Sequence, residues 1–163
     1  MIDTGLDTPT GGRCKIISES IGDETSFLTY GDGLADINID QLLKFHKKNQ
    51  KLITVSAVHP SARFGELDLD GDRVLAFKEK PQLQRGWING GFFVVEPGFF
   101  NYIDNPNVML EREPIEKATL DSQLYAYKHE GFWQCMDTRR DHELLEKLWN
   151  DNKAPWKPSS IVK

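Results

Sequence analysis

Apolar and polar residues follow two periodicities along the chain, and these predict both strands and helices. Residues 26–30 and 51–58 are short β-prone apolar runs. Between them, Asn38 stands as a cap before apolar residues at helical spacing, and the pattern ends in a group of lysines. A strand, a helix and a second strand in this order predict a βαβ unit, and therefore a parallel sheet.

The second half of the chain shows further elements of both kinds. Alternation around the turn pair Asp70-Gly71 predicts a hairpin over residues 64–80. The remaining expectations are a strand over 91–96 that is broken by Pro97-Gly98, a helix over 111–120, a strand over 123–128 and a last helix capped by Thr138. Turn-forming residues in 1–13 predict an irregular start, followed by a short helix over 16–21. The predicted class is α/β with an inserted β-hairpin and C-terminal helices.

Composition narrows the classes of function. The chain has 163 residues, of which 39% are hydrophobic, so we expect a single domain over 1–163 with a core over 1–153 and a tail over 154–163. A net charge of -5 disfavours nucleic-acid binding. No apolar run is long enough to span a membrane, and no leader segment is visible. The two cysteines are too few for a disulfide scaffold, so a cytoplasmic protein is expected.

Two short segments contain charged residues that could bind a phosphorylated ligand. Asp32 lies between two glycines directly after a predicted strand, where open α/β sheets bind ligands, although the same tripeptide is also typical of a tight turn. Glu79 and Lys80 together could bind the hydroxyls and the phosphate of a sugar phosphate, or could be a solvated charge run.

Two further segments could complete a ligand site. Asn89, followed by two glycines, presents an amide and bare backbone before a strand, although an ordinary loop would have the same residues. Asp137 could ligate a metal, or Asp137 and Thr138 could simply cap the last helix. The histidines and cysteines show no spacing typical of a zinc site or of nucleophilic catalysis.

Taken in chain order, these segments form a longer pattern. It comprises residues 10–13, 28–33, 62–65, 77–81, 87–93, 111–114 and 131–138. The pattern resembles the glucose-1-phosphate cytidylyltransferases, a family of the sugar nucleotidyltransferase superfamily. The resemblance implies a partial Rossmann-like nucleotidyltransferase sheet. It also implies a Mg²⁺-dependent reaction in which CTP and α-D-glucose 1-phosphate give CDP-glucose and pyrophosphate.

The resemblance also implies roles for individual residues. Asp32 and Asp137 would hold the Mg²⁺, and Lys80 would bind the sugar phosphate as a third catalytic residue. The implied substrate-binding residues are Thr10, Gly12 and Arg13 near cytosine and ribose, Tyr30 and Gly31 beside Asp32, Gly65, Asn89 and Gly90 around the sugar, and Glu79 with Lys80 on glucose 1-phosphate. A homo-oligomer and a place in dideoxyhexose synthesis for surface polysaccharide (lipopolysaccharide O-antigen) are implied as well.

The sequence departs from the family pattern at its start. The glycine-rich GxGTRL loop and the following lysine, which cradle the triphosphate in the family, are not found in the chain. We therefore expect the C-terminal two thirds of a catalytic domain, beginning inside the strand that ends at Asp3, with chemistry severely slowed. Cys135 stands where the family has proline. Two alternatives stay open: a non-catalytic homologue that binds sugar phosphate or assembles with intact subunits, and a nucleotidyltransferase for UTP or another sugar.

Overall fold

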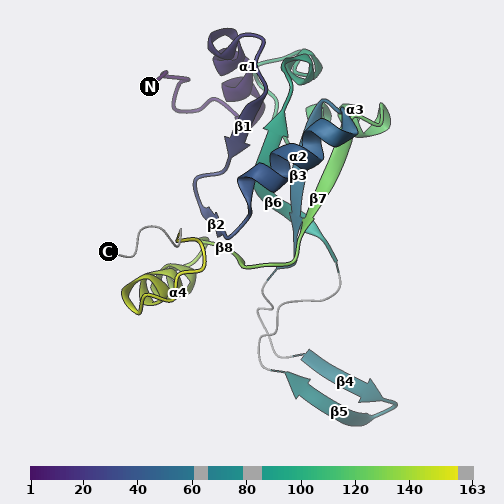
Figure 1. The fold of residues 1–163 in the computed structure, drawn as a ribbon, viewed down its shortest axis with the longest axis vertical. Coiled ribbons are helices and arrows are strands. Elements are labelled where there is room, and N and C mark those ends of the chain that lie inside the picture. The colour runs from purple at the N-terminus through teal and green to yellow at the C-terminus, as the bar shows by residue number, and fades with distance from the viewer. Residues whose placement is uncertain (61–65, 79–85, 158–163) are drawn as a thin grey trace. The chain divides into compact units, whose positions relative to one another are not determined.

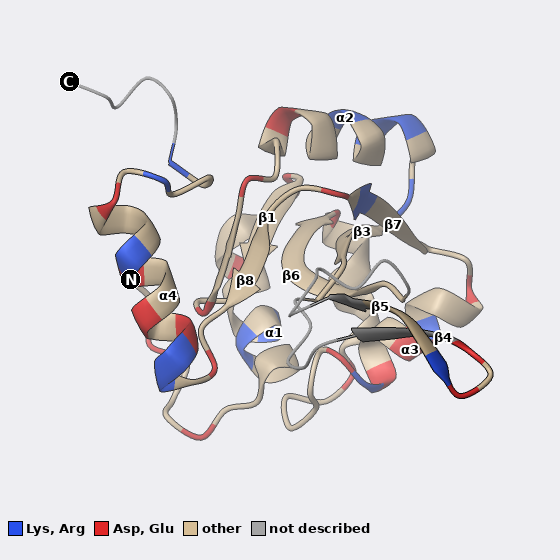
Figure 2. Cartoon of the chain, turned by 90° about the horizontal axis from the view of Figure 1, so that it is seen from below, with Lys and Arg blue, Asp and Glu red and all other residues tan. Residues whose placement is uncertain are grey.

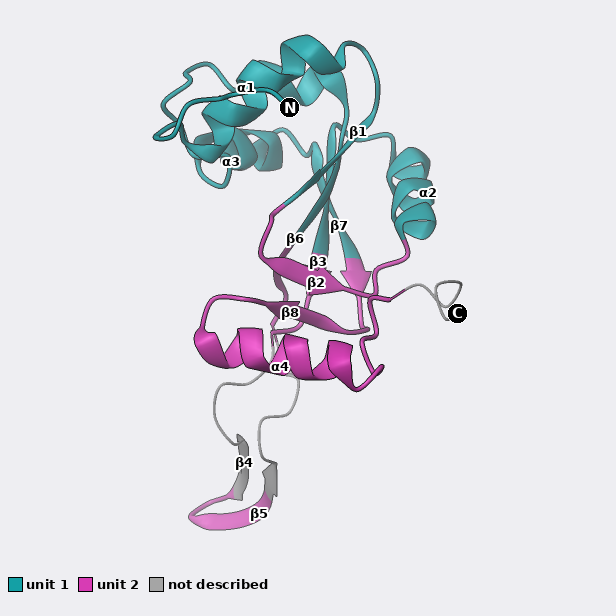
Figure 3. Cartoon of the chain, turned by 90° about the vertical axis from the view of Figure 1, so that its left-hand side faces the viewer, with its two compact units in different colours: residues 1–29, 39–56, 91–127 teal, residues 30–38, 57–90, 128–163 magenta. Residues whose placement is uncertain are grey.

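The computed structural model describes residues 1–60, 66–78 and 86–157. The chain divides into two compact units, coloured separately in Figure 3. Unit 1 comprises Met1–Thr29, Ile39–Ser56 and Gly91–Tyr127, and unit 2 comprises Tyr30–Asn38, Ala57–Gly90 and Lys128–Lys163. No helix in the described part of the chain is long and apolar enough to cross a bilayer.

A four-stranded sheet in the order β1-β6-β3-β7 is the centre of the fold (Figure 1). Its strands are β1 (Ser26–Thr29), β3 (Ile53–Val58), β6 (Ile88–Val95) and β7 (Leu124–His129). The βαβ connection from β1 to β3 is present, but β6 lies between the two strands and runs antiparallel to β1. The prediction of a parallel sheet is therefore wrong in this respect, and the sheet is mixed. The predicted α/β class is confirmed.

The apolar core of unit 1 forms where helices cover this sheet. The helical elements are α1 (Thr10–Ile21), α2 (Ile39–Asn49), the 3-10 helix η1 (Pro97–Tyr102) and α3 (Glu113–Leu120). Leu42 on α2 and Phe93 on β6 are almost completely buried, as is Phe99 in η1. Figure 2 shows an acidic residue at the start of α2 and basic residues at its end, which is the favourable arrangement with the helix dipole.

A buried histidine links α2 to the sheet. His46 Nδ1 lies 2.8 Å from Thr54 Oγ1 on β3, and His46 Nε2 lies 3.0 Å from Glu96 Oε1 just after β6. The same carboxylate oxygen accepts a hydrogen bond from Thr25 Oγ1, 2.8 Å away. Since a carboxylate only accepts, His46 Nε2 carries a hydrogen. One polar network therefore fixes α2 against two strands of unit 1.

The start of the chain differs from the prediction. Residues 10–13 are not irregular, because α1 begins at Thr10 and includes two buried glycines in its first turn. The Gly11 amide donates to Val108 O at 3.1 Å, and the Leu110 amide donates to Thr10 Oγ1 at 2.9 Å. The first bond satisfies an amide at the helix start that has no acceptor within the helix, and the second ties the Thr10 side chain to the distant loop. A distant loop therefore decides where α1 begins.

Unit 2 is built from short elements. It contains the strands β2 (Gly33–Ala35) and β8 (Trp133–Cys135), the hairpin strands β4 (Glu66–Asp70) and β5 (Arg73–Lys78), and the helix α4 (Arg139–Asn150). The predicted hairpin is confirmed, with Asp70 paired to Arg73 across the turn. Gly71 in that turn has a φ of 59°, which favours glycine. The sequence did not predict β2 and β8.

Candidate functional site

Two acidic residues lie at the same end of the β2–β8 ladder. The ladder is antiparallel, with Gly33 opposite Cys135, and the Met136 amide donates to Asp32 O at 2.8 Å. Asp32 therefore lies opposite Met136, and Asp137 is the next residue along. Both aspartates are exposed to solvent. Pairing of two three-residue strands thus places together two carboxylate residues that are 105 positions apart in the sequence, since 137 − 32 = 105.

Asp137 does not belong to the cap of α4. Thr138 is the N-cap residue of that helix, and its side chain and the side chain of Asp141 form a reciprocal capping box. The carboxylate of Asp137 instead accepts a hydrogen bond from Cys135 Sγ, 3.2 Å from Oδ2. Burial, together with this carboxylate, raises the pKa of the Cys135 thiol to about 11. The cap of α4 is therefore formed by Thr138 together with Asp141, and Asp137 lies one residue before it.

Asn89 and Gly90 lie in the same unit and are held from two sides. Asn89 Nδ2 donates to the Tyr30 hydroxyl oxygen at 3.1 Å, and Trp133 Nε1 donates to Gly90 O at 2.8 Å. Trp133 belongs to β8, and Tyr30 stands two residues before Asp32. The predicted sugar segment is therefore hydrogen-bonded to the elements that position both aspartates. Trp133 has no role in the sequence-based predictions, and its indole four residues before Asp137 was the available signal.

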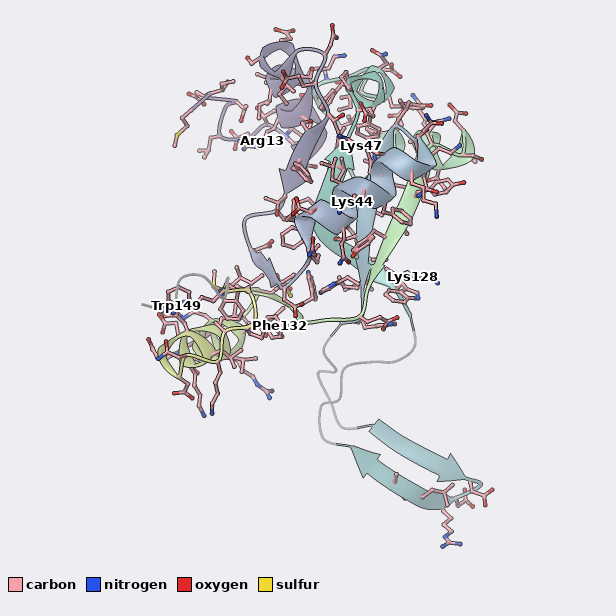
Figure 4. The ribbon with its side chains drawn as sticks, viewed as in Figure 1. Arg13, Lys44, Lys47, Lys128, Phe132 and Trp149 are labelled. Atoms are coloured by element: carbon pink, nitrogen blue, oxygen red, sulfur yellow. The ribbon has the colours of Figure 1, made fainter. Side chains whose placement is uncertain are left out.

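Thr10, Gly12 and Arg13, predicted near cytosine and ribose, lie in unit 1, where Gly12 is buried and the other two side chains are hydrogen-bonded. The Thr10 hydroxyl donates to Glu111 Oε2 at 2.8 Å. Arg13 donates to Thr4 Oγ1 at 2.7 Å and to the Leu6 carbonyl at 2.8 Å. These contacts anchor the first turn of α1 and the segment before it (Figure 4). Their role in nucleotide binding stays a prediction.

The other predicted substrate residues divide into two groups. Gly31 is exposed, and a Cβ at this position would meet no atom of the described residues within 4 Å. A ligand could therefore approach the backbone here. Gly65, Glu79 and Lys80 lie outside the described residues, so their predicted roles on the sugar phosphate stay predictions.

The donor set suits a cation that takes few protein ligands. Within 1–60, 66–78 and 86–157, no group of three or more histidine, cysteine or carboxylate residues could enclose a metal ion. Asp32 and Asp137 offer two carboxylates, both exposed. Mg²⁺ is usually bound by one or two carboxylates, with phosphate oxygens and water completing the shell, whereas zinc requires a fuller protein shell. Two exposed carboxylates are therefore a donor set that fits Mg²⁺.

The fold and this site define a class. The profile of the nucleotidyl transferase family matches residues 10–151, and the chain belongs to this family. Among curated proteins, the chain is similar to the glucose-1-phosphate cytidylyltransferase of Salmonella typhi, with 46% identity over 96% of this chain and 62% of the relative. It is also similar to a protein of Bacillus subtilis named "Probable glucose-1-phosphate cytidylyltransferase", with 40% identity over 96% of this chain and 61% of the relative.

A solved structure supports the fold independently. HddC from Yersinia pseudotuberculosis superposes with a TM-score of 0.64 over 89% of this chain and 64% of its own, at 17% identity. Such a likeness at low identity shows the Rossmann-like fold alone. The chain spans about 62% of the length of the Salmonella relative.

Proposed function

We propose that this chain transfers a cytidylyl group from CTP to α-D-glucose 1-phosphate, giving CDP-glucose and pyrophosphate. The observation that carries the proposal is the placement of Asp32 and Asp137 at one end of the β2–β8 ladder, with Asn89 and Gly90 bonded to the same elements. Membership of the nucleotidyl transferase family and the names of the Salmonella and Bacillus relatives support it. We also propose that residues 1–163 form a single domain.

The chemistry requires positioning and charge neutralisation more than covalent help. A phosphate oxygen of the sugar phosphate attacks the α-phosphorus of CTP, the new P–O bond forms, and the bond to the leaving pyrophosphate breaks. Asp32 and Asp137 would hold Mg²⁺, which when bound neutralises the phosphate charge and orients the triphosphate. The protein residues would hold the attacking phosphate oxygen in line with the bond between the α-phosphorus and the leaving pyrophosphate.

The remaining roles are those that the resemblance to the family implies. The Asn89 amide and the Gly90 backbone, with Gly65, would surround the glucose ring. Glu79 would accept hydrogen bonds from its hydroxyls, and Lys80 would pair with its phosphate. Thr10, Gly12 and Arg13 are proposed beside cytosine and ribose. Each of these assignments is part of the proposal.

Cellular setting is a separate part of the proposal. Cys14 and Cys135 are both free thiols, which suits a reducing compartment such as the cytoplasm. We propose a homo-oligomer there, making a nucleotide sugar for dideoxyhexoses of surface polysaccharide.

The test is pyrophosphate release from CTP and glucose 1-phosphate with Mg²⁺. Asp32→Asn and Asp137→Asn should each lower kcat by about 100-fold or more, because each removes one charge from the proposed cation site. Asp72→Asn in the β4–β5 turn is the matched control and should act like wild type. If the two residues act as a unit, kcat of the double variant Asp32→Asn/Asp137→Asn should be only slightly lower than kcat of either single variant.

A second readout does not depend on turnover. Binding of Mn²⁺ in the presence of CTP, followed by electron paramagnetic resonance, should weaken in both variants and not in Asp72→Asn. Activity within a few-fold of the control in either variant would refute the proposed site. A folded wild-type chain that binds glucose 1-phosphate and releases no pyrophosphate would favour the non-catalytic alternative. Parallel assays with UTP test the choice of nucleotide.

A further inference from the structure

A separate group of contacts in unit 2 surrounds the imidazole of His59, which directly follows β3. Only 8% of this residue is exposed. Nδ1 lies 2.9 Å from Gly86 O, and since a carbonyl only accepts, Nδ1 carries the hydrogen. The ring also packs on the indole of Trp87, with 3.9 Å between ring centroids. His59 therefore fixes a segment that lies 27 residues further along the chain.

Two charged residues also lie beside His59 and Trp87. His59 Nε2 lies 3.4 Å from Glu130 Oε2, and Lys128 Nζ lies 5.5 Å from the centroid of the Trp87 ring. Figure 4 labels Lys128 on β7. The Glu130 side chain is 74% exposed, so its ion pair contributes little on its own. The bond to Gly86 and the ring packing are therefore stronger constraints than this pair.

These constraints lie just before the proposed sugar segment. Gly86 has a φ of 91°, so the chain bends there in a conformation that favours glycine, and Asn89 follows three residues later. Tyr30 holds the Asn89 amide and Trp133 holds the Gly90 carbonyl. His59 supplies the third anchor, on the N-terminal side. Small errors in the position of a substrate-binding group are costly in catalysis, so such an anchor has functional consequences.

We propose that His59 is a positioning residue for the sugar phosphate. Through Gly86 and Trp87 it sets where Asn89 and Gly90 meet the glucose ring. This inference rests on the function proposed above, since that proposal assigns Asn89 and Gly90 to the binding of the sugar phosphate. His59 itself touches neither substrate in this role.

Two substitutions separate the hydrogen bond from the ring packing. His59→Phe keeps an aromatic ring against Trp87 and removes both ring nitrogens. His59→Asn places an amide nitrogen where Nδ1 stood, so it can still donate to Gly86 O. The matched control is His142→Phe, which changes a half-exposed histidine on α4 of the same unit. Steady-state kinetics with each substrate, calorimetric binding of glucose 1-phosphate and melting temperatures are measured for all variants.

We expect His59→Phe to raise the KM and the dissociation constant for glucose 1-phosphate about tenfold, which corresponds to one hydrogen bond. The KM for CTP should stay within about twofold of His142→Phe, since only the sugar segment moves. His59→Asn should restore most of the affinity for glucose 1-phosphate that His59→Phe loses. If His59→Phe lowers the melting temperature, His59→Gln replaces it, because its amide extends toward the Nε2 position.

Several results would overturn the inference. One is an equal rise in the KM for CTP and for glucose 1-phosphate in His59→Phe. Another is an unchanged dissociation constant for glucose 1-phosphate in that variant. The third is His59→Asn with an unchanged melting temperature and no recovery of affinity for glucose 1-phosphate. A wild-type chain that binds glucose 1-phosphate without releasing pyrophosphate would refute the transfer reaction, and the dissociation constants would still decide the role of His59. A wild-type chain that does not bind glucose 1-phosphate would refute both.

Discussion

Replacing Gly12 with alanine separates a packing role from a ligand-binding role for this residue. Gly12 is buried in the first turn of α1. A Cβ at this position would lie 2.0 Å from Pro106 O and 2.9 Å from Thr8 Cγ2. The nearest atom belongs to the main chain, so it cannot rotate away as a flexible side chain could.

Two effects of opposite sign determine the result of Gly12→Ala. Alanine favours a helix over glycine by about 1 kcal/mol. A methyl group forced into a packed interior typically costs about 1–3 kcal/mol, and more where the backbone has to move. The contact with Pro106 O is shorter than an ordinary nonbonded contact by more than about 1 Å. We therefore expect a net loss of about 2–3 kcal/mol, or about 5–10 °C in Tm.

Urea and thermal unfolding followed by circular dichroism measure this loss. The matched control is Gly98→Ala, whose Cβ would lie 3.0 Å from Leu52 Cδ2, the end of a flexible side chain. We expect the control to lose less than about 1 kcal/mol. An unchanged Tm in Gly12→Ala, with CTP binding lost, would refute the packing argument and favour the proposed place beside cytosine and ribose.

Three further predictions concern the stability of the chain. His46→Leu removes the buried bonds from α2 to β3 and to the end of β6, so urea unfolding should show a loss of about 2–4 kcal/mol, whereas a loss below about 1 kcal/mol would contradict the network. Burial, with Glu111 nearby, raises the pKa of the Cys14 thiol from 9.0 to about 11. The thiol therefore loses its proton at a lower pH in the unfolded state than in the folded state. The free energy of unfolding should consequently fall between pH 9 and 11. Cys14→Ala should flatten that fall, and an identical pH profile would exclude the thiol as its cause. Thr138→Ala removes the N-cap of α4 and should lower the free energy of unfolding by about 1 kcal/mol in a thermal unfolding experiment. Thr138→Ser should keep most of the wild-type stability.

The sequence by itself determined the elements whose signals are local. The pair Asp70-Gly71 indicated the hairpin turn, and the structure has the turn there with a positive φ at the glycine. Pro97-Gly98 marked the end of β6, where η1 begins. The cap at Thr138 was also predicted, because a capping box is formed by side chains only three residues apart.

Tertiary structure decided the features whose partners are distant in the chain. The first turn of α1 is fixed by the Val108 carbonyl, which accepts from the Gly11 amide, and by the Leu110 amide, which donates to Thr10 Oγ1. β6 enters the sheet between β1 and β3, and this position has no signal in the order of elements along the chain. A long-range contact can thus override a local preference.

For the same reason, the sequence indicated the candidate site residues but not their arrangement in space. Asp32 and Asp137 were each ambiguous in the sequence, since a turn explains the first and a helix cap explains the second. β2 and β8 have three residues each, too few to show a periodicity, and each becomes a strand only because the other pairs with it. The resemblance to a family named the two aspartates, and the ladder supplies the physical cause of their proximity. Sequence therefore determined which groups are available, and long-range pairing placed the two residues at the same end of one ladder.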